Sequence, residues 1–340
     1  MLVKVHMLSA ASTQEADLLR RMKEGIEAQL IPADDADRVK LKRINRNEGL
    51  GLGVEFAYTP SYDKCDVAVM LGSWKYERGN THHQVRTSIA EKAKCFICIE
   101  TPILNRTVAF DQCEYFRVGV NGFLNKDAYF GPEKNHTNDR LKKHPIAFNG
   151  WNPPNTNNKV VVAMQLHGDA SLRGTNINGW AYEVITQLLI RTHRPIEVRL
   201  HPALSGKGLV GHDDLLRLLA YSDVDYSRVK FVKGSEITWK EQIADAHCVV
   251  AYTSGLSIDA ILSGVPVIAY DEGNFAWNIS DTTLDKVENI KRAPVTDVQQ
   301  WLNNLAYCQW TAEEMGNGTV WNHLRPGIEE CLLRLKQEEQ

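Results

Sequence analysis

The sequence of 340 residues predicts an α/β protein with two doubly wound domains and a C-terminal helical tail. Segments typical of strands and helices alternate along most of the chain, as they do in proteins with parallel sheets. The strand segments are short, continuous apolar runs, which are typical of strands covered on both faces. At roughly 150 residues per domain, the length predicts two domains, each large enough for its own core.

Composition and charge exclude several classes of protein. The chain is 43% hydrophobic and 24% charged with a net charge of −3, so we expect an ordinary globular protein without a global basic field for nucleic acid. Residues 1–150 carry 22 Lys and Arg against 19 Asp and Glu, whereas residues 151–340 carry 17 against 23. No apolar run approaches the roughly 18–20 residues of a membrane span, and no signal-peptide pattern begins the chain, so a cytoplasmic location is expected, in the host if the protein is viral.

The first half contains strand and helix segments in alternation. We expect strands at 2–8, 66–72 and 95–100, and helices at 13–30 and 82–93. Leu19, Met22 and Ile26 belong to an apolar stripe on the first helix, for which Thr13 is the expected N-cap. Residues 121–158 are rich in Asn, Pro and Gly, which predicts a surface loop that ends in a linker between domains.

The alternation becomes more regular from residue 159. We expect strands at 159–166, 196–202, 229–232, 248–252 and 266–270, with helices at 178–193, 212–221, 238–246 and 257–264. Five such repeats predict a doubly wound domain with right-handed crossovers. Two further helices are expected at 301–310 and 321–337. The predicted parts are therefore 1–150, 151–300, and a tail at 301–340 that packs back on the domains.

The cysteines predict buried thiols and no metal site. There are seven, an odd and scattered set, and several lie inside apolar runs, which fits a reducing compartment better than a disulfide framework. Cys95 and Cys98 form a CxxC pair, but a zinc site would need a second pair of ligands at matching spacing. Because the pair lies in a strand segment, we expect it to pack in the core.

Ligands of parallel sheets bind at the loops that follow the carboxyl ends of the strands. The loop at 167–174 offers two glycines, the carboxylate of Asp169 and the guanidinium of Arg173. It is either part of a binding site or a polar turn in which Asp169 acts as a cap.

The loop at 199–208 begins with His201 at the end of a strand and contains Lys207. An imidazole can donate a hydrogen bond to a phosphate oxygen, and Lys207 can add a point charge. The alternative is a histidine that is satisfied by a backbone carbonyl.

The segment 252–264 turns from a strand into a helix through Thr253, Ser254 and Gly255. Their hydroxyls and the N–H groups of the turn, with Ser257 just beyond, predict a phosphate site. An ordinary N-cap is the alternative.

Acidic and aromatic residues follow the last strand of this domain, at 270–277. Asp271 and Glu272 are able to accept hydrogen bonds from sugar or ribose hydroxyls, and Phe275 or Trp277 could stack on a ring. An acidic surface turn above buried aromatics is equally consistent with the sequence. Taken together, the four loops suit a nucleotide mono- or diphosphate that carries a sugar. Neither a GxxxxGK[ST] loop nor a GxGxxG motif after the first strand is present.

The residues of these loops resemble the GT-B class of nucleotide-sugar glycosyltransferases, above all capsule-polysaccharide synthesis proteins, bacterial sialyltransferase-like enzymes and related phage proteins. The resemblance lies in GDASLRG, RPIEVRLHP, TSGLSIDAILSGVPVIAY and LAYCQWTAEEM, and it covers about residues 160–320. It implies a GT-B-like fold in which two Rossmann-like domains face a cleft. Residues 1–150 would be the acceptor side, and residues 151–300 would bind the nucleotide-sugar.

The resemblance also implies roles for individual residues. His201, Thr253 and Ser254 would hold the donor phosphate, and transfer would be inverting, without a metal or a cofactor other than the donor. Such enzymes carry their general base in an acidic motif before the His-Pro pair. Here the only string of that kind, Asp271-Glu272-Gly273, lies after it, so the role is not transferred.

The general base is instead expected among other carboxylates and histidines. Glu100 is the first candidate because it ends a strand of the first domain, where the carboxyl end is expected to meet the cleft. Its alternative role is that of a helix-capping or salt-bridged acid. Three further candidates follow: His82, His83 and Asp169. Arg173, His201 and Lys207 would stabilise the leaving phosphate.

Three other functions stay open at this stage. A UDP-sugar epimerase would use Asp169, Asp271 and Glu272 around the sugar. A transferase acting on hydroxylated bases of phage DNA would use the basic run at 40–47 with the aromatic residues Trp74 and Tyr76. A nucleotide-sugar binding protein would lack turnover altogether.

Overall fold

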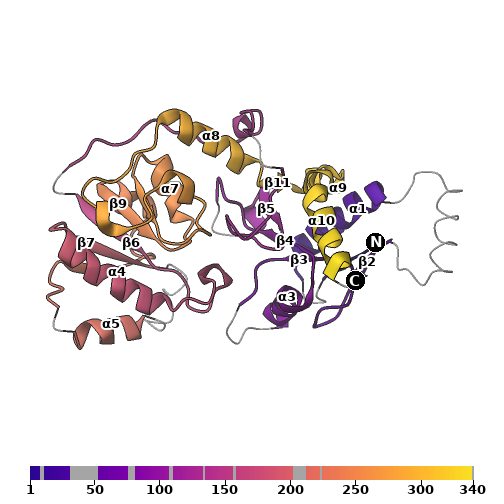
Figure 1. The fold of residues 1–340 in the computed structure, drawn as a ribbon, viewed down its shortest axis with the longest axis horizontal. Coiled ribbons are helices and arrows are strands. Elements are labelled where there is room, and N and C mark those ends of the chain that lie inside the picture. Colours follow the sequence, from indigo (N-terminus) through magenta and orange to yellow (C-terminus); the bar gives the residue numbers. More distant parts are fainter. Residues whose placement is uncertain are drawn as a thin grey trace, which may run out of the picture. The chain divides into compact units, whose positions relative to one another are not determined.

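The computed structural model describes the chain as two compact units (Figure 1). It describes residues 1–7, 11–30, 53–75, 81–106, 110–132, 135–155, 158–201, 212–222 and 224–338, with the backbone alone at 81–82. Unit 1 consists of residues 1–123, 127–144 and 303–340, and unit 2 of residues 124–126 and 145–302. The C-terminal residues thus belong to unit 1.

The sheet of unit 1 has six strands in the order β11-β5-β4-β3-β1-β2. Their bounds are β1 Leu2–His6, β2 Gly53–Ala57, β3 Val67–Leu71, β4 Phe96–Glu100, β5 Tyr115–Val120 and β11 Gln309–Thr311. The strands β2, β1, β3 and β4 are parallel, whereas β5 pairs antiparallel with both β4 and β11. The predicted β1, β3 and β4 are confirmed, and β2, β5 and β11 were not predicted. The expected helix at 301–310 was wrong in its last residues, which form β11 instead.

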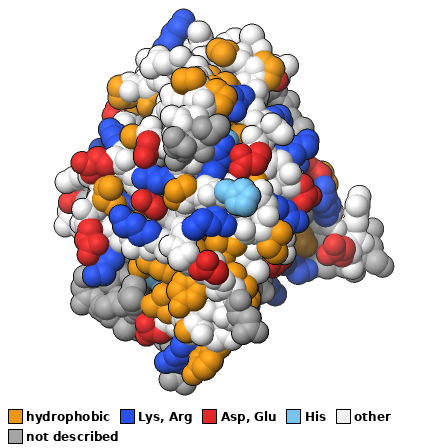
Figure 2. Space-filling view, turned by 90° about the vertical axis from the view of Figure 1, so that its left-hand side faces the viewer, with side chains coloured by type: hydrophobic (Ala, Val, Ile, Leu, Met, Phe, Trp, Pro, Cys, Tyr) orange, Lys and Arg blue, Asp and Glu red, His pale blue; other side chains and the backbone are white. Residues whose placement is uncertain are grey.

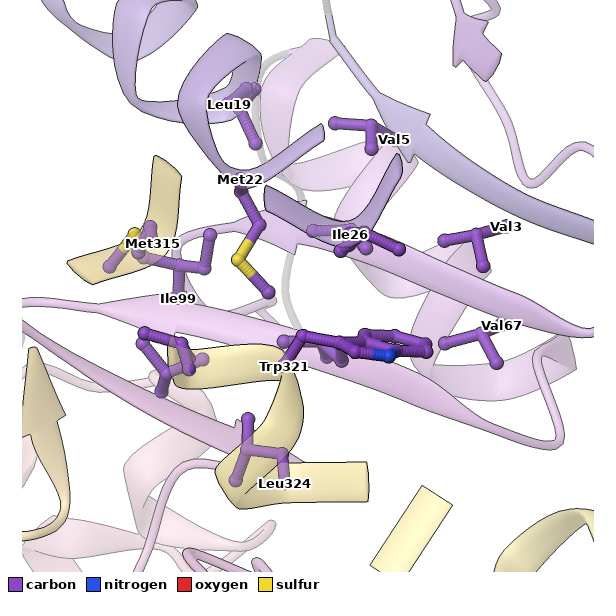
Figure 3. Packing of buried hydrophobic residues seen from close by; sticks show 14 of the residues in the cluster. Val3, Val5, Leu19, Met22, Ile26, Val67, Ile99, Met315, Trp321 and Leu324 are labelled. Carbon is purple, nitrogen blue, oxygen red and sulfur yellow. The ribbon is translucent and has the colours of Figure 1, made fainter. Parts of the chain in front are cut away.

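Helices cover both faces of this sheet. They are α1 Thr13–Leu30, α3 Thr81–Lys92, α9 Ala312–Gly316 and α10 Thr319–Glu338, with short 3-10 turns at Phe110–Gln112 and Leu141–Lys143. Figure 3 shows Met22 and Ile26 of α1 near Trp321 of α10, over strand residues that include Val67. Met70 points to the other face and is also buried, which explains the continuous apolar run of its strand.

The predicted bounds of α1 are confirmed, but its N-cap is Ser12 and not Thr13. The backbone N–H of Ser12 donates to Glu15 Oε2 at 2.7 Å, and the N–H of Glu15 donates to Ser12 Oγ at 3.3 Å. This reciprocal pair is a capping box. Thr13 therefore begins the helix and does not cap it.

The segment 121–158 was predicted as a surface loop, but part of it is firmly anchored in unit 1. Tyr129 bridges to Val120, and the buried guanidinium of Arg140 donates to Glu314 Oε1 at 2.7 Å. Side-chain and backbone hydrogen bonds fix this segment without helix or strand periodicity, so the sequence pattern gave no sign of it.

The sheet of unit 2 is wholly parallel, with the strand order β10-β9-β6-β7-β8. The strands are β6 Lys159–Ala163, β7 Ile196–Leu200, β8 Val229–Lys233, β9 Ala246–Ala251 and β10 Val267–Ala269. The helices are α4 Ile177–Arg191, α5 Asp213–Ala220, α6 Trp239–Ile243 and α7 Leu256–Leu262, with 3-10 turns at Ala170–Leu172, Trp277–Ile279 and Leu284–Lys286. The helix α8 Val295–Ala306 begins in unit 2, and its last four residues are counted in unit 1. Counted from β6, this is the 3-2-1-4-5 order of doubly wound nucleotide-binding folds, so the predicted fold class is confirmed.

The order reverses between β6 and β9, and this switch point is where such sheets bind ligands. Buried side chains on both sides of the sheet form the core of unit 2, among them Val162, Val184 and Ile268. The loops that follow β6 and β9 are therefore the natural place for a site.

The surface carries mixed charge, and the cysteines of the CxxC pair lie in the core. Acidic and basic side chains are mixed across the face shown in Figure 2, while hydrophobic ones gather toward its lower edge. Cys95 and Cys98 are buried and free, as predicted for core thiols. Within the described part of the chain, none of the helices combines the length and the apolar character that a membrane crossing requires.

Candidate functional site in unit 2

The loop between β6 and α4 is a tight turn with unusual backbone conformations. Arg173 has a φ of 52°, in the left-handed region that residues other than glycine seldom adopt, and Gly174 follows with a φ of 82°. Asp169 Oδ1 accepts a hydrogen bond from the backbone of Ser171 at 2.9 Å and so caps the 3-10 turn. The carboxylate of Asp169 thus caps the turn, which is the second of the two roles that the sequence predicted for it. The strained backbone conformation fixes the position of Arg173.

A buried hydrogen-bond network joins this loop to the loop after β9. Thr253 N donates to Gln165 Oε1 at 3.0 Å, and Gln165 Nε2 donates to Thr253 Oγ1 at 3.0 Å. The hydroxyl of Thr253 in turn donates to the carbonyl of Ser171 at 2.6 Å. Because both side chains are buried, this network locks the two sides of the switch point together.

The network changes the assignment of Thr253. Its hydroxyl was predicted to bind phosphate, but it is committed as a donor and as an acceptor inside the protein. Thr253 therefore positions the loops. Gln165 was not predicted, although a polar residue at the end of the apolar run VVVAMQL was a sign of it.

The turn into α7 contains the other residues predicted to bind phosphate. Ser254 Oγ accepts from the backbone N–H of Leu256, the first residue of α7, at 3.3 Å, and Gly255 occupies the N-cap position. Ser257 is fully buried, and Asn274 Nδ2 donates to its hydroxyl at 2.8 Å. The prediction that Ser257 contacts a ligand was wrong because the hydroxyl lies inside the core.

Arg173 connects the β6 loop to the acidic residues after β10. Its guanidinium donates to Asp271 Oδ1 at 2.8 Å and lies 3.6 Å from Glu272 Oε1. Asp271 Oδ1 also accepts from the backbone of Gly273 at 2.8 Å, whereas Glu272 is half exposed. The structure thus brings together three predicted site residues, and Glu272 is the more accessible carboxylate for a ligand hydroxyl.

Three aromatic residues, Tyr252, Phe275 and Trp277, belong to the same loops as the acidic residues or to the loop beside them. Tyr252 Oη lies 2.7 Å from Thr175 Oγ1, and burial together with the charge of Asp271 raises the pKa of Tyr252. Phe275 is buried, so the prediction that it stacks on a ligand ring was wrong. Trp277 is partly exposed.

Histidines gather at the carboxyl ends of β6 and β7. His201 ends β7 and is partly buried. Burial lowers the pKa of His212, and the charges of His201 and His167 act in the same direction, while the charge of Asp213 opposes them. His212 Nδ1 lies 3.2 Å from Asn178 Oδ1. Lys207, the other basic residue predicted here, lies outside the described residues.

Glu100, the first candidate for the general base, lies in unit 1 and is held by hydrogen bonds. Its carboxylate accepts from the backbone N–H groups of Ser73 and Thr101, both at 2.8 Å. Burial alone would raise the pKa of Glu100, but the charge of Arg117 and these N–H donors lower it overall. A stably ionised, fully bonded carboxylate suits a structural role, so the geometry argues against Glu100 as the base.

The remaining predicted residues lie mainly in unit 1. Trp74 packs edge-on against Phe96 and Phe123 and is thereby engaged in the protein. His83 lies in the first turn of α3. The basic run 40–47, Tyr76 and the side chain of His82 lie outside the described residues. Among the side chains that the structure describes, no three of His, Cys, Asp or Glu come together as a metal-binding group.

Comparisons with known proteins give similarities in structure alone. No family model matches the sequence, and no curated protein matches it. KpsC of Thermosulfurimonas dismutans, a β-Kdo 2,4 transferase, matches with 14% identity and a TM-score of 0.46 over 90% of this chain and 89% of that chain. Its β-Kdo 2,7 transferase matches with 13% identity and a TM-score of 0.45, over 95% and 99%.

A UDP-GlcNAc 2-epimerase from Neisseria meningitidis bound to UDP-GlcNAc also matches, with 9% identity and a TM-score of 0.29 over 97% of this chain and 100% of that chain. All three TM-scores are below 0.5, so neither site residues nor activities transfer from these proteins to this chain. The chain is thus a protein of two α/β units that is similar in structure, at low identity, to glycosyltransferases and to nucleotide-sugar epimerases.

Proposed function

We propose that this protein transfers a sugar from a nucleotide-sugar donor to a hydroxyl group of an acceptor. The observation that carries the proposal is the ion pair between Arg173 and Asp271 at the switch point of a 3-2-1-4-5 sheet. A guanidinium suits phosphate, and the neighbouring carboxylates suit the hydroxyls of a sugar or ribose. All of them lie on loops that follow the carboxyl ends of parallel strands, where this kind of sheet binds ligands.

Different loops bind different parts of the donor. Arg173 and His201 bind the phosphates, together with Ser254 and the backbone of Gly255, while Lys207 is retained as a further basic contact from the resemblance. Glu272 accepts from a ribose or sugar hydroxyl, with Asp271 fixing the position of Arg173. Thr253 acts as a positioning residue because its hydroxyl is already bonded.

The proposed reaction is a single displacement with inversion. The acceptor oxygen forms a bond to the anomeric carbon as the bond from that carbon to the phosphate oxygen breaks. The acceptor proton passes to a base, for which we propose Oδ2 of Asp169, since the cap of the 3-10 turn uses Oδ1, and the leaving phosphate takes the electron pair. Arg173 and His201 stabilise the charge that develops on the phosphate. The donor is the only small molecule that this reaction needs besides the acceptor.

Epimerisation of a UDP-sugar is the second candidate. The observation that favours it is the position of Glu272 and Asp271 around one guanidinium, with Asp169 on the same loop as that guanidinium. Several carboxylates around one sugar could exchange a proton at carbon without an acceptor. For transfer, we propose a glycan acceptor, and a hydroxylated DNA base is the alternative acceptor.

Nucleotide binding followed by product analysis tests the proposal. Isothermal titration with UDP, CMP, CDP, GDP and ADP is expected to give binding of one base class. Arg173→Gln should weaken that binding, whereas Arg217→Gln, an exposed arginine on α5 of the same unit, should leave it unchanged. The best donor is then incubated with and without acceptor glycans.

The products of these incubations distinguish transfer, epimerisation and binding without turnover. Glycoside formed only with an acceptor supports transfer, and an isomer formed without an acceptor supports epimerisation. Binding without any product would make the chain a nucleotide-sugar binding protein. Failure of every nucleotide to bind would overturn the proposal.

A further inference from the structure

Unit 1 has its own switch point, and a small pocket lies beside it. In the order β2-β1-β3-β4 the chain reverses direction across the sheet between β1 and β3. His6 ends β1 and Leu71 ends β3, and both line the pocket together with Val85 and Arg86 of α3. The pocket volume of about 30 Å³ has room for a small head group and not for a nucleotide.

Arg86 is held in this pocket by its contact with a glycine. Gly72 follows β3 with a φ of 82°, and a Cβ atom placed there would lie 2.6 Å from Arg86 Cζ. The guanidinium therefore lies directly against the backbone at the end of β3. Because the side chain is half-buried, its position is fixed by packing and not by an ion pair.

Among the residues that the structure describes, Arg86 has no acidic partner, unlike Arg140 and Arg194. Arg140 binds Glu314 at 2.7 Å, and Arg194 binds Glu288 at 3.0 Å. Within the described ranges, no carboxylate lies within ion-pair distance of Arg86, and its guanidinium makes no hydrogen bond. The half-buried guanidinium is partly desolvated, and its N–H donors are not used by the described protein groups. An anionic ligand would accept hydrogen bonds from them.

The other polar groups of the pocket are already engaged. His6 Nε2 accepts from the backbone of Asp63 at 3.1 Å, so its Nδ1 carries the proton and donates to the carbonyl of Lys4 at 3.2 Å. Burial lowers the pKa of His6, which keeps the imidazole neutral. Glu15 is bound to the N-cap of α1 through Ser12. Arg86 is thus the group in this pocket with free hydrogen-bond donors.

Charged groups of both signs lie around Arg86. Arg86, Arg117 and Glu100 all act on the thiol of Cys98 in β4. Two carboxylates lie near the guanidinium: Glu100 accepts from two backbone N–H groups, and Glu15, which lines the same pocket, accepts from the backbone N–H of Ser12. Since both carboxylates are held by backbone donors, an anion in the pocket would be the group that pairs with Arg86 directly.

We propose that the Arg86 pocket binds a carboxylate or phosphate group carried by the acceptor, so that the acceptor is an acidic sugar or a sugar phosphate. The anion site follows from the contacts of Arg86. Its assignment to the acceptor rests on the proposed sugar transfer. The planar guanidinium binds two oxygens of such a group side by side, and the small pocket excludes a larger anion.

The test compares three sugars on the full-length protein without any nucleotide. Glucuronate, glucose 6-phosphate and neutral glucose are titrated by calorimetry at constant ionic strength. We expect one of the two charged sugars to bind at least about tenfold more tightly than glucose, the effect of one charged hydrogen bond or more. Comparison of the two charged sugars tells carboxylate from phosphate.

Variants then assign the preference to Arg86. Arg86→Gln should abolish it, and Arg86→Lys should retain only part of it because the ammonium lacks the two-pronged geometry. Arg325→Gln, an exposed arginine of the same unit that pairs with Glu329, should have no effect. Equal binding of charged and neutral sugars by the wild type would overturn the proposal, and so would an unchanged preference in a folded Arg86→Lys or Arg86→Gln protein.

The outcome is separable from that of the proposed function. Nucleotide affinity of Arg86→Gln should equal that of the wild type, because the donor residues lie in unit 2. If the wild type binds no nucleotide, the assignment of the anion to an acceptor is wrong. If the wild type binds nucleotide but shows no preference for charged sugars, the Arg86 site is wrong.

Discussion

Arg173 and Asp271 are 98 residues apart in the sequence, and their side chains form an ion pair of 2.8 Å. The first follows β6 and the second follows β10, while β9 lies between these strands in the sheet. The pair thus spans the end of β9, where Thr253 joins the loop after β9 to the loop after β6 through Gln165 and Ser171. Three loops of the switch point therefore behave as one structural element.

Replacing Arg173 by Gln should weaken nucleotide binding about tenfold or more, because a charged hydrogen bond contributes about 1.5–3 kcal/mol. Calorimetry with the nucleotide that binds best measures the change. Asp271→Asn should have a smaller effect, since it leaves the guanidinium in place. Equal loss in Asp271→Asn and Arg173→Gln would instead show that the ion pair itself, and not the arginine, supports the ligand.

Thr253→Val should lower the free energy of unfolding by about 1–3 kcal/mol. The substitution keeps the shape of the side chain but leaves the carbonyl of Ser171 and the amide of Gln165 without their buried partner. Chemical denaturation of unit 2, followed by hydrogen exchange in β6 and β9, measures the loss. Thr253→Ser keeps the hydroxyl and is the control; full stability of the valine variant would contradict the network.

Two helical glycines should respond in opposite directions to alanine. A Cβ on Gly25 of α1 would lie 1.8 Å from the backbone oxygen of Met315, so Gly25→Ala should destabilise unit 1 by about 1–3 kcal/mol or more. The nearest atom to a Cβ on Gly179 of α4 lies at 3.8 Å, so Gly179→Ala should stabilise the helix by up to about 1 kcal/mol. Hydrogen exchange in each helix reports both changes. A tolerated Gly25→Ala would place α9 farther from α1 than described here.

Glu100 should make a contribution to stability that disappears in acid. Its folded-state pKa lies below the ordinary value of 4.5, so the stabilisation is present above about pH 4.5 and is lost as the pH falls through the lowered value. Glu100→Gln should therefore lower the thermal midpoint at pH 7, and the difference from the wild type should shrink below pH 4.5.

The same variant tests the role of Glu100 in the reaction. Removal of a general base costs about 100-fold to 10,000-fold in turnover, whereas a structural carboxylate should cost much less in a protein that is still folded. Asp169→Asn provides the comparison, and the larger loss is expected there. A loss of 100-fold or more in Glu100→Gln alone would restore Glu100 as the base.

In unit 1, the strands β3 and β4, which are buried on both faces, were readable from the sequence, whereas the edge strands β2 and β11 were not, and neither was β5 inside the sheet. β3 and β4 are continuous apolar runs, and each was predicted to within two residues. β2 contains the exposed Glu55 in a five-residue segment, and β11 is only three residues long after a helix. Such strands owe their existence to a neighbour, because pairing with β1 or β5 supplies the hydrogen bonds that the local sequence does not specify.

The candidate site was likewise predicted only in part from the sequence. The sequence placed Arg173, Asp271 and Glu272 on loops after strands, and the rule for parallel sheets put those loops at one edge. It did not reveal that the hydroxyl of Ser257 faces Asn274 in the core, or that Glu100 receives two backbone N–H groups. Hydroxyl and carboxylate groups bind backbone and ligand with the same chemistry, so residue type alone could not distinguish the two.

The sequence by itself determined the alternation of strands and helices, the parallel sheet of unit 2 and the loops that carry chemistry, because hydrophobic periodicity is a local property of the chain. The tertiary structure decided which polar groups are free. Gln165, Thr253 and Ser257 are satisfied by partners up to 88 residues away, whereas the guanidinium of Arg86 has no such partner in the described chain. Burial and hydrogen bonding between distant segments set that difference, and these arise only when the chain has folded.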